Sequence, residues 1–189
     1  MSTSLLWQIL LYAWTASEIY IAIATRTRRG GGKRLDRGSM AILWVTIVFS
    51  ITAAEWIAGR TTPNVFGGAR WLKIAAIVVL ITGVVIRWTA ILSLGNAFSA
   101  NVAIRDNQTI YKSGLYRFVR HPSYSGLWLV FLAIAIHERN WLAAAVVITP
   151  TTAALLYRIY VEEAALHQAF GANYSSYRST TKRLIPGIY

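Results

Sequence analysis

The sequence predicts an all-α membrane protein with about five transmembrane helices, and three observations support this prediction. Of the 189 residues, 56% are hydrophobic, and the mean hydropathy is +0.46. Only 14% are charged, whereas roughly 25% is typical of soluble domains. The apolar residues form runs of the length that a bilayer-crossing helix needs, roughly 20 residues, and most charges lie between these runs.

Five apolar segments are the expected helices. In the second, Ser39 is expected to cap the start and Gly59 to follow the end. The fourth holds only about 14 residues, so it either crosses the bilayer or forms, with the turn at 137–140, a hairpin whose tip lies in the interface. The fifth is apolar at first and charged later, and it is the expected C-terminal helix. The segments are 5–25, 39–58, 71–94, 123–136 and 141–170.

The length of the chain suits one structural domain whose two parts have different expected roles. Residues 1–94 hold three transmembrane helices, and residues 95–189 hold a long polar loop, two helices and a tail. Of the 19 basic residues, 14 lie in 26–37, in 95–122 and from Arg158 onward. The positive-inside rule places these regions in the cytoplasm and the N-terminus outside. Four tryptophans are expected near the opposite face as an aromatic belt: Trp7, Trp56, Trp71 and Trp141.

Composition also excludes several classes of protein and site. The formal net charge is +12, but the basic residues lie in short loops between apolar segments, which indicates membrane orientation rather than nucleic-acid binding. The chain contains no cysteine. A disulfide framework, a thiolate metal site and a cysteine nucleophile are therefore excluded.

The remaining isolated polar residues give no metal-binding pattern. His137 and His167 lack partners at metal-ligand spacing, so we expect them in a turn and on a helix surface, and we expect no metal. Glu18, Glu55 and Arg87 lie in or near apolar spans. For Glu55 and Arg87 we favour a structural role over a place along the path of a ligand.

The polar stretch 95–122 contains several apolar residues, and a long connection in a compact protein is usually functional or disordered. At its end, Arg120 and His121 supply hydrogen-bond donors where the fourth helix begins. Pro122 suits a first helical turn, and the free N–H groups of that turn favour a carboxylate. The alternative interpretation is a basic helix start at the membrane interface, whose cations reach lipid headgroups.

A second polar cluster follows in the fifth helix. Arg158 and Glu162 are spaced i, i+4 and therefore share one face, and Glu163 is adjacent. Charged residues at the end of a membrane helix often face a polar cavity, although an ordinary ion pair at the membrane boundary has the same spacing. Together the two clusters indicate a cytoplasm-facing pocket with an arginine, a histidine, two glutamates and several tyrosines.

These clusters resemble two motifs of the isoprenylcysteine carboxyl methyltransferase family. GLYRFVRHPSYSG, residues 114–126, is similar to the family's glycine–tyrosine–Arg-His-Pro–tyrosine–glycine signature. RIYVEEAALHQAFGANYSSY, residues 158–177, is similar to its Arg-x-x-x-Glu-Glu and Phe-Gly-x-x-Tyr-x-x-Tyr pattern. The resemblance covers about residues 95–186, and related membrane phospholipid methyltransferases share a similar pattern. Leu115 stands where relatives often carry proline or valine, and we expect no consequence.

The resemblance implies a cytoplasmic loop that binds S-adenosyl-L-methionine, and an enzyme that transfers its methyl group. Arg158 and Glu162 are the implied catalytic residues. Arg158 would bind the substrate by orienting the acceptor carboxylate, and Glu162 would contact the ammonium group of the cofactor. The implied cofactor-binding residues are Asn101, which matches less well, and Gln108, Thr109, Ile110, Tyr111, Tyr116, His121, Pro122, Ser123, Tyr124 and Glu162.

The implied acceptor is lipophilic and isoprenylcysteine-like, and it would enter from the bilayer while the cofactor enters from water. A carboxylate needs an orienting cation, which the planar fork of Arg158 supplies. An amine acceptor would instead need a base such as Glu162, Glu163 or His121. Phospholipid or amine N-methylation, a sterol-reductase-like NADPH enzyme and a non-enzymatic binding module remain alternatives. The short chain is typical of a prokaryotic relative, in an inner or plasma membrane.

Overall fold

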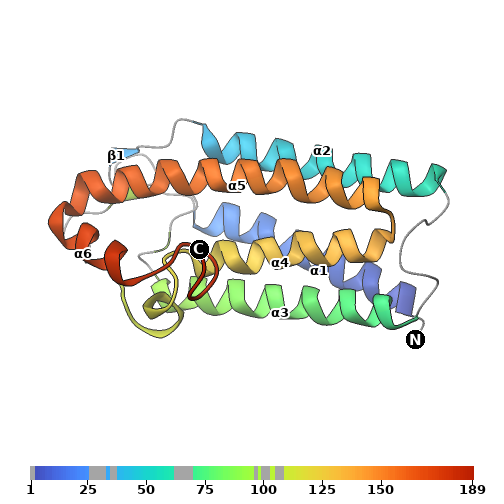
Figure 1. The fold of residues 1–189 in the computed structure, drawn as a ribbon, viewed down its shortest axis with the longest axis horizontal. Coiled ribbons are helices and arrows are strands. Elements are labelled where there is room, and N and C mark those ends of the chain that lie inside the picture. Colours follow the sequence, from blue (N-terminus) through green and yellow to red (C-terminus); the bar gives the residue numbers. More distant parts are fainter. Residues whose placement is uncertain are drawn as a thin grey trace.

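The structure is a computed structural model that describes residues 3–25, 33–34, 38–61, 70–95, 98, 103–104 and 109–189. Five long helices form an up-and-down bundle in which each runs antiparallel to the next (Figure 1). They are α1 (Thr3–Ala24), α2 (Ser39–Arg60), α3 (Arg70–Leu94), α4 (Pro122–Glu138) and α5 (Trp141–Phe170). The prediction of an all-α fold is confirmed.

Helices from the two parts of the chain pack against each other in the bundle. The helix α3 packs against α4, α2 packs against α5, and α1 contacts α3. Shorter elements gather at the end where α5 finishes (Figure 1). They are the paired strands β1 (Lys33–Arg34) and β2 (Ala103–Ile104), the 3-10 helix η2 (Gly114–Arg117) and the helix α6 (Ala172–Thr180).

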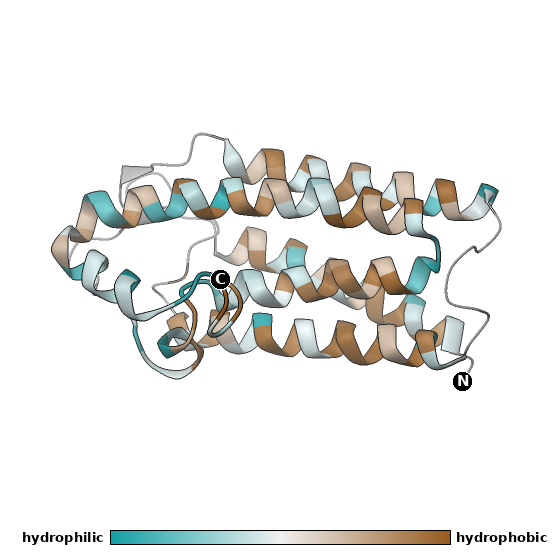
Figure 2. Ribbon diagram, viewed as in Figure 1, coloured by the Kyte–Doolittle hydropathy of each residue, from teal (hydrophilic) through white to brown (hydrophobic). Residues whose placement is uncertain are grey.

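Four helices in the described part of the chain are long and apolar enough to cross a bilayer: α1, α2, α3 and α5. The helix α4 has 17 residues, or about 26 Å at 1.5 Å per residue, slightly less than a hydrocarbon core of about 30 Å. It runs between α3 and α5 through the bundle (Figure 1), which favours a crossing helix over a hairpin tip. Figure 2 shows apolar residues along the bundle and hydrophilic residues in α6 and the last turns of α5.

Two expected helix boundaries were wrong. Ser39 lies inside the first turn of α2, because Gly38 occupies the capping position with a left-handed φ of 81°. Gly59 lies within α2, which continues to Arg60. The expected end of the fifth helix near Phe170 is confirmed, and a break at Gly171, with φ of 49°, separates α5 from α6.

The turn between α4 and α5 is shorter than the expected 137–140. It needs only Arg139, in a left-handed conformation with φ of 52°, and Asn140. The Asn140 side chain accepts hydrogen bonds from the amides of Leu142 and Ala143 at 2.9 and 3.1 Å, and donates to Thr61 at 2.6 Å. Asn140 therefore caps α5 and ties its start to the end of α2.

One member of the expected tryptophan belt is not at the surface. Trp7 is 5% exposed and stacks on the ring of His137, with 4.0 Å between ring centroids. His137 lies in the last turn of α4 rather than in a free turn, which explains this contact. The other three are each more than half exposed: Trp56 lies near the end of α2, and Trp71 and Trp141 lie at the starts of α3 and α5.

A glycine pair brings α3 and α4 into backbone contact. A Cβ on Gly126 would lie 2.5 Å from the carbonyl oxygen of Gly83 and 2.6 Å from the amide nitrogen of Arg87. No side chain other than hydrogen fits there, because real Cβ atoms essentially never approach so closely. The contact places the side chain of Arg87 beside the first turn of α4, which carries part of the site described next.

Candidate active site

The first turn of α4 and the charged half of α5 meet through a tyrosine hydroxyl. Tyr124 donates a hydrogen bond of 2.8 Å to Oε2 of Glu162. The same hydroxyl accepts a bond of 3.2 Å from Nε of Arg158. The expectation that Arg158 and Glu162 share a face is confirmed, and Tyr124 joins them from the neighbouring helix. We call these three residues the tyrosine bridge.

Arg158 is the largest fully buried side chain in the described part of the chain, with 1% of its surface exposed. Its Nη1 donates a hydrogen bond of 2.7 Å to Oγ of Ser39, at the start of α2. A buried guanidinium requires several hydrogen-bond acceptors. These contacts with α2 and α4 hold its planar head in one orientation.

Glu163, adjacent in sequence, faces another direction and joins a second cluster. Its two carboxylate oxygens accept hydrogen bonds from Nε of Arg120 at 2.8 Å and from Nε of Arg183 at 3.2 Å. Nη1 of Arg120 also donates to the backbone carbonyls of Thr181 and Arg178. We call Arg120, Glu163 and Arg183 the tail clamp, because they fasten the chain after α6 to the start of α4.

Backbone contacts strengthen the tail clamp. The amide of Arg120 donates to the carbonyl of Lys182 at 2.8 Å, and the amide of His121 donates to that of Arg183 at 3.0 Å. Ser125 donates from Oγ to the carbonyl of Leu184 at 2.6 Å. The sequence suggests Arg120 as a donor for a ligand or for lipid headgroups, but its side chain bonds to Glu163, Thr181 and Arg178. Its role here is therefore structural.

His121 lies between the two clusters. Its ring stacks on that of Tyr124, with 5.7 Å between centroids, and its Nε2 is 3.4 Å from the Glu163 carboxylate. Nε2 is buried without a good hydrogen bond to any described residue. His121 therefore packs against the tyrosine bridge while its polar edge faces the tail clamp.

Several buried tyrosines surround Glu162. Tyr116 of η2 accepts at its carbonyl a hydrogen bond of 2.6 Å from Tyr177 of α6, and its ring meets Tyr111 edge-on with 5.5 Å between centroids. Burial, together with the Glu162 charge, raises the pKa of the Tyr116 phenol above its ordinary value. Burial likewise raises the pKa of Tyr174, and it raises the pKa of Tyr177 to about 12. These phenols stay neutral and act as hydrogen-bonding groups.

The other expected cofactor residues fall in three groups. Tyr111 adjoins Tyr116, with the half-buried Ile110 and the exposed Thr109 just before it. Pro122 opens α4, as expected for a first helical turn. Ser123 accepts a hydrogen bond from Arg87 at 2.9 Å, so its hydroxyl has a partner within the protein. The remaining two, Asn101 and Gln108, lie outside the described residues.

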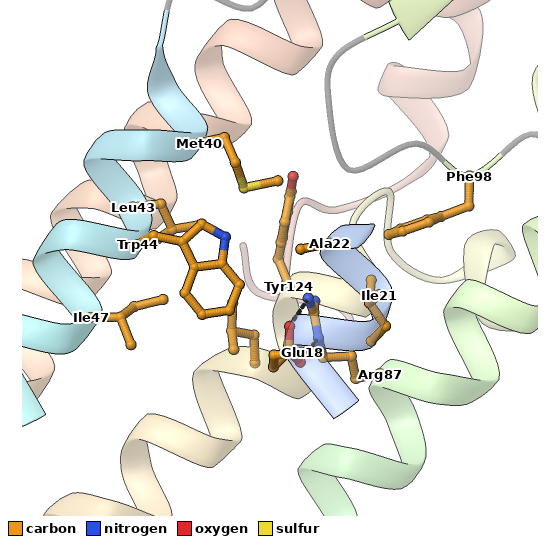
Figure 3. A pocket seen from close by; sticks show the side chains of 11 residues that line it. Glu18, Ile21, Ala22, Met40, Leu43, Trp44, Ile47, Arg87, Phe98 and Tyr124 are labelled. Carbon is orange, nitrogen blue, oxygen red and sulfur yellow. Dashed lines mark hydrogen bonds and ion pairs between the residues drawn. The ribbon is translucent and has the colours of Figure 1, made fainter. Parts of the chain in front are cut away.

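Tyr124 of the tyrosine bridge also lines an apolar groove. Leu43, Trp44 and Ile47 of α2 line one side, and Ile21 and Ala22 of α1 line another (Figure 3). Tyr124, Met40, Leu127, Phe98, Glu18 and Arg87 complete the lining.

Sequence reasoning missed three residues of this region. Ser39 was expected to be a helix cap but contacts Arg158, and Glu18 was left without a role although it lines the groove. A structural role was favoured for Arg87, and its side chain does form an ion pair, with Glu18 as the partner. Glu55 is exposed. The available signal was the presence of charged residues inside two apolar spans. No group of three or more His, Cys, Asp or Glu side chains in the described part of the chain could hold a metal.

Comparison with known proteins identifies the family. Residues 75–168, about half of the chain, match the model of the isoprenylcysteine carboxyl methyltransferase (ICMT) family. The chain belongs to this family. The match begins within α3, earlier than the resemblance near residue 95, and it ends before the Phe-Gly-x-x-Tyr-x-x-Tyr segment.

Members of the ICMT family with curated names support the assignment. Protein-S-isoprenylcysteine O-methyltransferase B of Arabidopsis thaliana is 29% identical over 111 residues, covering 58% of this chain and 56% of the relative. The Schizosaccharomyces pombe protein-S-isoprenylcysteine O-methyltransferase is 32% identical over 111 residues, covering 58% of this chain and 47% of the relative. The chain thus spans about half the length of the curated relatives it matches.

A solved structure extends the likeness to the fold. The eukaryotic intramembrane Ras methyltransferase ICMT matches with a TM-score of 0.56 and 26% identity, covering 80% of this chain and 50% of that one. As an ICMT family member with four helices of spanning length and composition, the protein is an integral, multi-pass membrane protein.

Proposed function

We propose that this protein is an S-adenosyl-L-methionine-dependent methyltransferase that esterifies the carboxylate of a lipophilic, isoprenylcysteine-like acceptor. The observation that carries the proposal is that Tyr124, whose hydroxyl joins Arg158 and Glu162, also lines an apolar groove. The names of the curated relatives, which are protein-S-isoprenylcysteine O-methyltransferases, support it. In this proposal Arg158 and Glu162 are the catalytic residues.

The cofactor part of the proposal rests on the surroundings of Glu162. Among the described residues, the hydroxyl of Tyr124 is its hydrogen-bond donor, which leaves carboxylate lone pairs for the ammonium group of S-adenosyl-L-methionine. The hydroxyl of Tyr174, on a side chain 1% exposed, has no hydrogen-bond partner in the same part of the chain and fits a polar ligand. When bound, the cofactor supplies an electrophilic methyl group on a sulfonium. Tyr111, Tyr116, His121 and Tyr124 would line its site.

The acceptor part of the proposal rests on the groove and Arg158. The groove suits an apolar chain, and the guanidinium fork near its Tyr124 wall suits a carboxylate. A carboxylate is ionised at neutral pH, so no general base is needed. Arg158 would orient the nucleophilic oxygen toward the methyl group of the cofactor, and the surrounding apolar side chains would exclude water.

Topology would give the cofactor and the acceptor separate routes into the site. We propose that α6, the tail clamp and the start of α4 face the cytoplasm, where the cofactor enters, and that the acceptor enters from the bilayer between α1 and α2. The asymmetric distribution of Lys and Arg supports this orientation.

An amine acceptor is the second candidate, and the structure narrows its choice of base. Glu163 accepts from Arg120 and Arg183, and charged hydrogen bonds of this kind favour the ionised, weakly basic carboxylate. Only Glu162 and His121 remain from the three bases expected for this chemistry. No specific feature of the groove favours an amine headgroup over a carboxylate.

Ligand-dependent melting of the detergent-purified protein tests the cofactor. A ligand that binds the folded state raises the melting temperature by mass action. We expect a shift with S-adenosylmethionine and S-adenosylhomocysteine, none with NADPH, and loss of the shift in Glu162→Ala. A shift with NADPH alone would instead support a reductase, and no shift with any ligand would support a binding module.

Methyl transfer then separates the acceptors. With labelled cofactor in proteoliposomes, we expect base-labile methyl esters on a farnesylcysteine derivative and no methylation of phosphatidylethanolamine. Methylation of the lipid amine alone would overturn the carboxylate proposal while leaving the methyltransferase proposal standing.

A further inference from the structure

We propose that Glu18 and Arg87 form a positioning pair that sets both the acceptor groove and the orientation of Tyr124. This inference rests on the proposed function and adds two residues to it. Neither residue belongs to the two motifs near residues 114–126 and 158–177, and Glu18 lies outside the segment that matches the family model.

The pair joins two transmembrane helices deep inside the bundle. Arg87 of α3 donates from Nε and Nη2 to both carboxylate oxygens of Glu18 in α1, with 2.6 Å between Nη2 and Oε2. Glu18 is 2% exposed and Arg87 is 7% exposed. Figure 3 shows the two charged groups in contact at the wall of the groove.

Stability alone does not explain such a pair. Moving two charges out of water costs much of the energy that their attraction returns, and apolar residues of similar size are often as stabilising. Ionisable residues within membrane spans are more often associated with a functional site. The position of this pair, between a groove and the tyrosine bridge, indicates what that role is.

On one side the pair fixes a wall of the groove. Ile21 and Ala22 follow Glu18 by three and four positions, so they lie on the same face of α1. All three residues line the groove. Because α1 packs chiefly on α3, the bond to Arg87 determines how close this wall comes to the facing residues of α2.

On the other side the pair fixes the first turn of α4. Nη1 of Arg87 donates to Oγ of Ser123 at 2.9 Å and to its carbonyl oxygen at 3.2 Å. Ser123 directly precedes Tyr124, whose hydroxyl contacts Arg158 and Glu162. One guanidinium thus connects the groove wall in α1 to the residue that bridges the catalytic side chains.

The test removes the charges together and separately. In Glu18→Met/Arg87→Met, two apolar side chains of similar length replace the pair, which avoids leaving one charge buried alone. Glu18→Gln weakens the α1 contact and keeps the bonds from Arg87 to Ser123. Ser123→Ala removes one bond to α4 and keeps the ion pair. Thr152→Val is the matched control, because it removes another interhelical hydrogen bond, of 3.1 Å to Trp128.

Kinetics with the farnesylcysteine acceptor distinguish positioning from a merely structural role. We expect Glu18→Gln to raise the acceptor KM with kcat retained, and Ser123→Ala to lower kcat. The double variant should show both effects, each about tenfold or more, because small displacements of reacting groups greatly reduce the reaction rate. The KM of the cofactor should stay unchanged in Glu18→Gln, which keeps the bonds from Arg87 to Ser123, and Thr152→Val should match the parent protein.

A spectroscopic measurement makes the test independent of activity. The chain has no cysteine, so Ile23→Cys and Val45→Cys on the exposed faces of α1 and α2 accept spin labels selectively. We expect the distance distribution between the labels to broaden or shift in the double Met background and to stay unchanged with Thr152→Val.

The outcomes separate the inference from the proposed function. Parent-like kinetics and an unchanged label distance in a folded double variant would overturn the positioning role. Failure of the parent protein to bind S-adenosylmethionine would overturn the proposed function, and the label distances would still decide whether the pair sets the groove. If the double variant does not fold, parent-like kinetics in both Glu18→Gln and Ser123→Ala would overturn the inference.

Discussion

Glu162 and Glu163 are neighbours in sequence, yet they occupy opposite kinds of environment. Glu163 is 6% exposed and contacts Arg120, Arg183 and His121. Glu162 is partly exposed and accepts a hydrogen bond from one described group, the neutral hydroxyl of Tyr124. Successive residues of a helix point about 100° apart, so one carboxylate faces the chain after α6 and the other faces the tyrosine bridge.

This difference teaches how to separate a structural carboxylate from a ligand-binding one. A carboxylate whose oxygens already accept from two guanidinium groups has little capacity left for a ligand. A carboxylate that accepts from one neutral donor still has free lone pairs. We therefore assign Glu163 to the tail clamp, and our proposal assigns Glu162 to the cofactor.

The largest expected effect is a difference in unfolding free energy between variants of the two carboxylates. Glu163→Ala leaves two buried or partly buried guanidinium groups without their anion, which should lower the free energy of unfolding by about 3–5 kcal/mol. The matched variant Glu162→Ala removes one hydrogen bond, from Tyr124, and should lower it less, by about 1.5–3 kcal/mol. Denaturant unfolding in detergent measures both. Equal losses in the two variants would contradict the distinction.

The next largest effect is a loss of turnover when Arg158 of the tyrosine bridge is replaced. Arg158→Lys keeps the positive charge but loses the planar fork, and one ammonium group does not reproduce the contacts with Tyr124 and Ser39. We expect kcat to fall about 100-fold, while the Kd of S-adenosylhomocysteine stays the same. Arg139→Lys, at the opposite end of the bundle, is the control. Unchanged turnover in Arg158→Lys would contradict the proposal that Arg158 orients the acceptor carboxylate.

A smaller effect tests the bridging hydroxyl itself. Tyr124→Phe keeps the ring and its stacking on His121 but removes the bonds to Arg158 and Glu162. We expect kcat to fall about tenfold, because hydrogen bonds to charged groups contribute about 1.5–3 kcal/mol. Tyr160→Phe, on the exposed face of α5, should have no effect. A Tyr124→Phe enzyme with parent-like kcat would show that the two charged residues need no bridge.

The smallest expected effect is a loss of stability when one contact beside the tail clamp is removed. Ser125→Ala removes the 2.6 Å bond to the carbonyl of Leu184. We expect a loss of about 1 kcal/mol in unfolding free energy and unchanged kcat, because the bond contacts the tail and not the tyrosine bridge. Ser179→Ala, in exposed α6, should change neither quantity. A drop in kcat without a loss of stability would mean that the two clusters are coupled.

The sequence alone determined the helices and the motif residues. Runs of about 20 apolar residues can satisfy their backbone groups in a bilayer only as helices, so four of the five segments were predictable from length and hydropathy. The i, i+4 spacing of Arg158 and Glu162 placed both on one face, because that relation is local to one helix. The helix boundaries at Ser39 and Gly59 failed because Gly38 takes the capping position and α2 continues two residues further, to Arg60.

Only the tertiary structure decided which charges contact each other. Glu18 and Arg87 are 69 positions apart, and Ser39 and Arg158 are 119 positions apart. Helical periodicity specifies the face on which a side chain lies but not the helix that will cover that face. That choice depends on packing, such as the backbone contact between Gly83 and Gly126 that brings Arg87 to α4. The same reason explains why Glu162 and Glu163 look equivalent in sequence and differ in the fold.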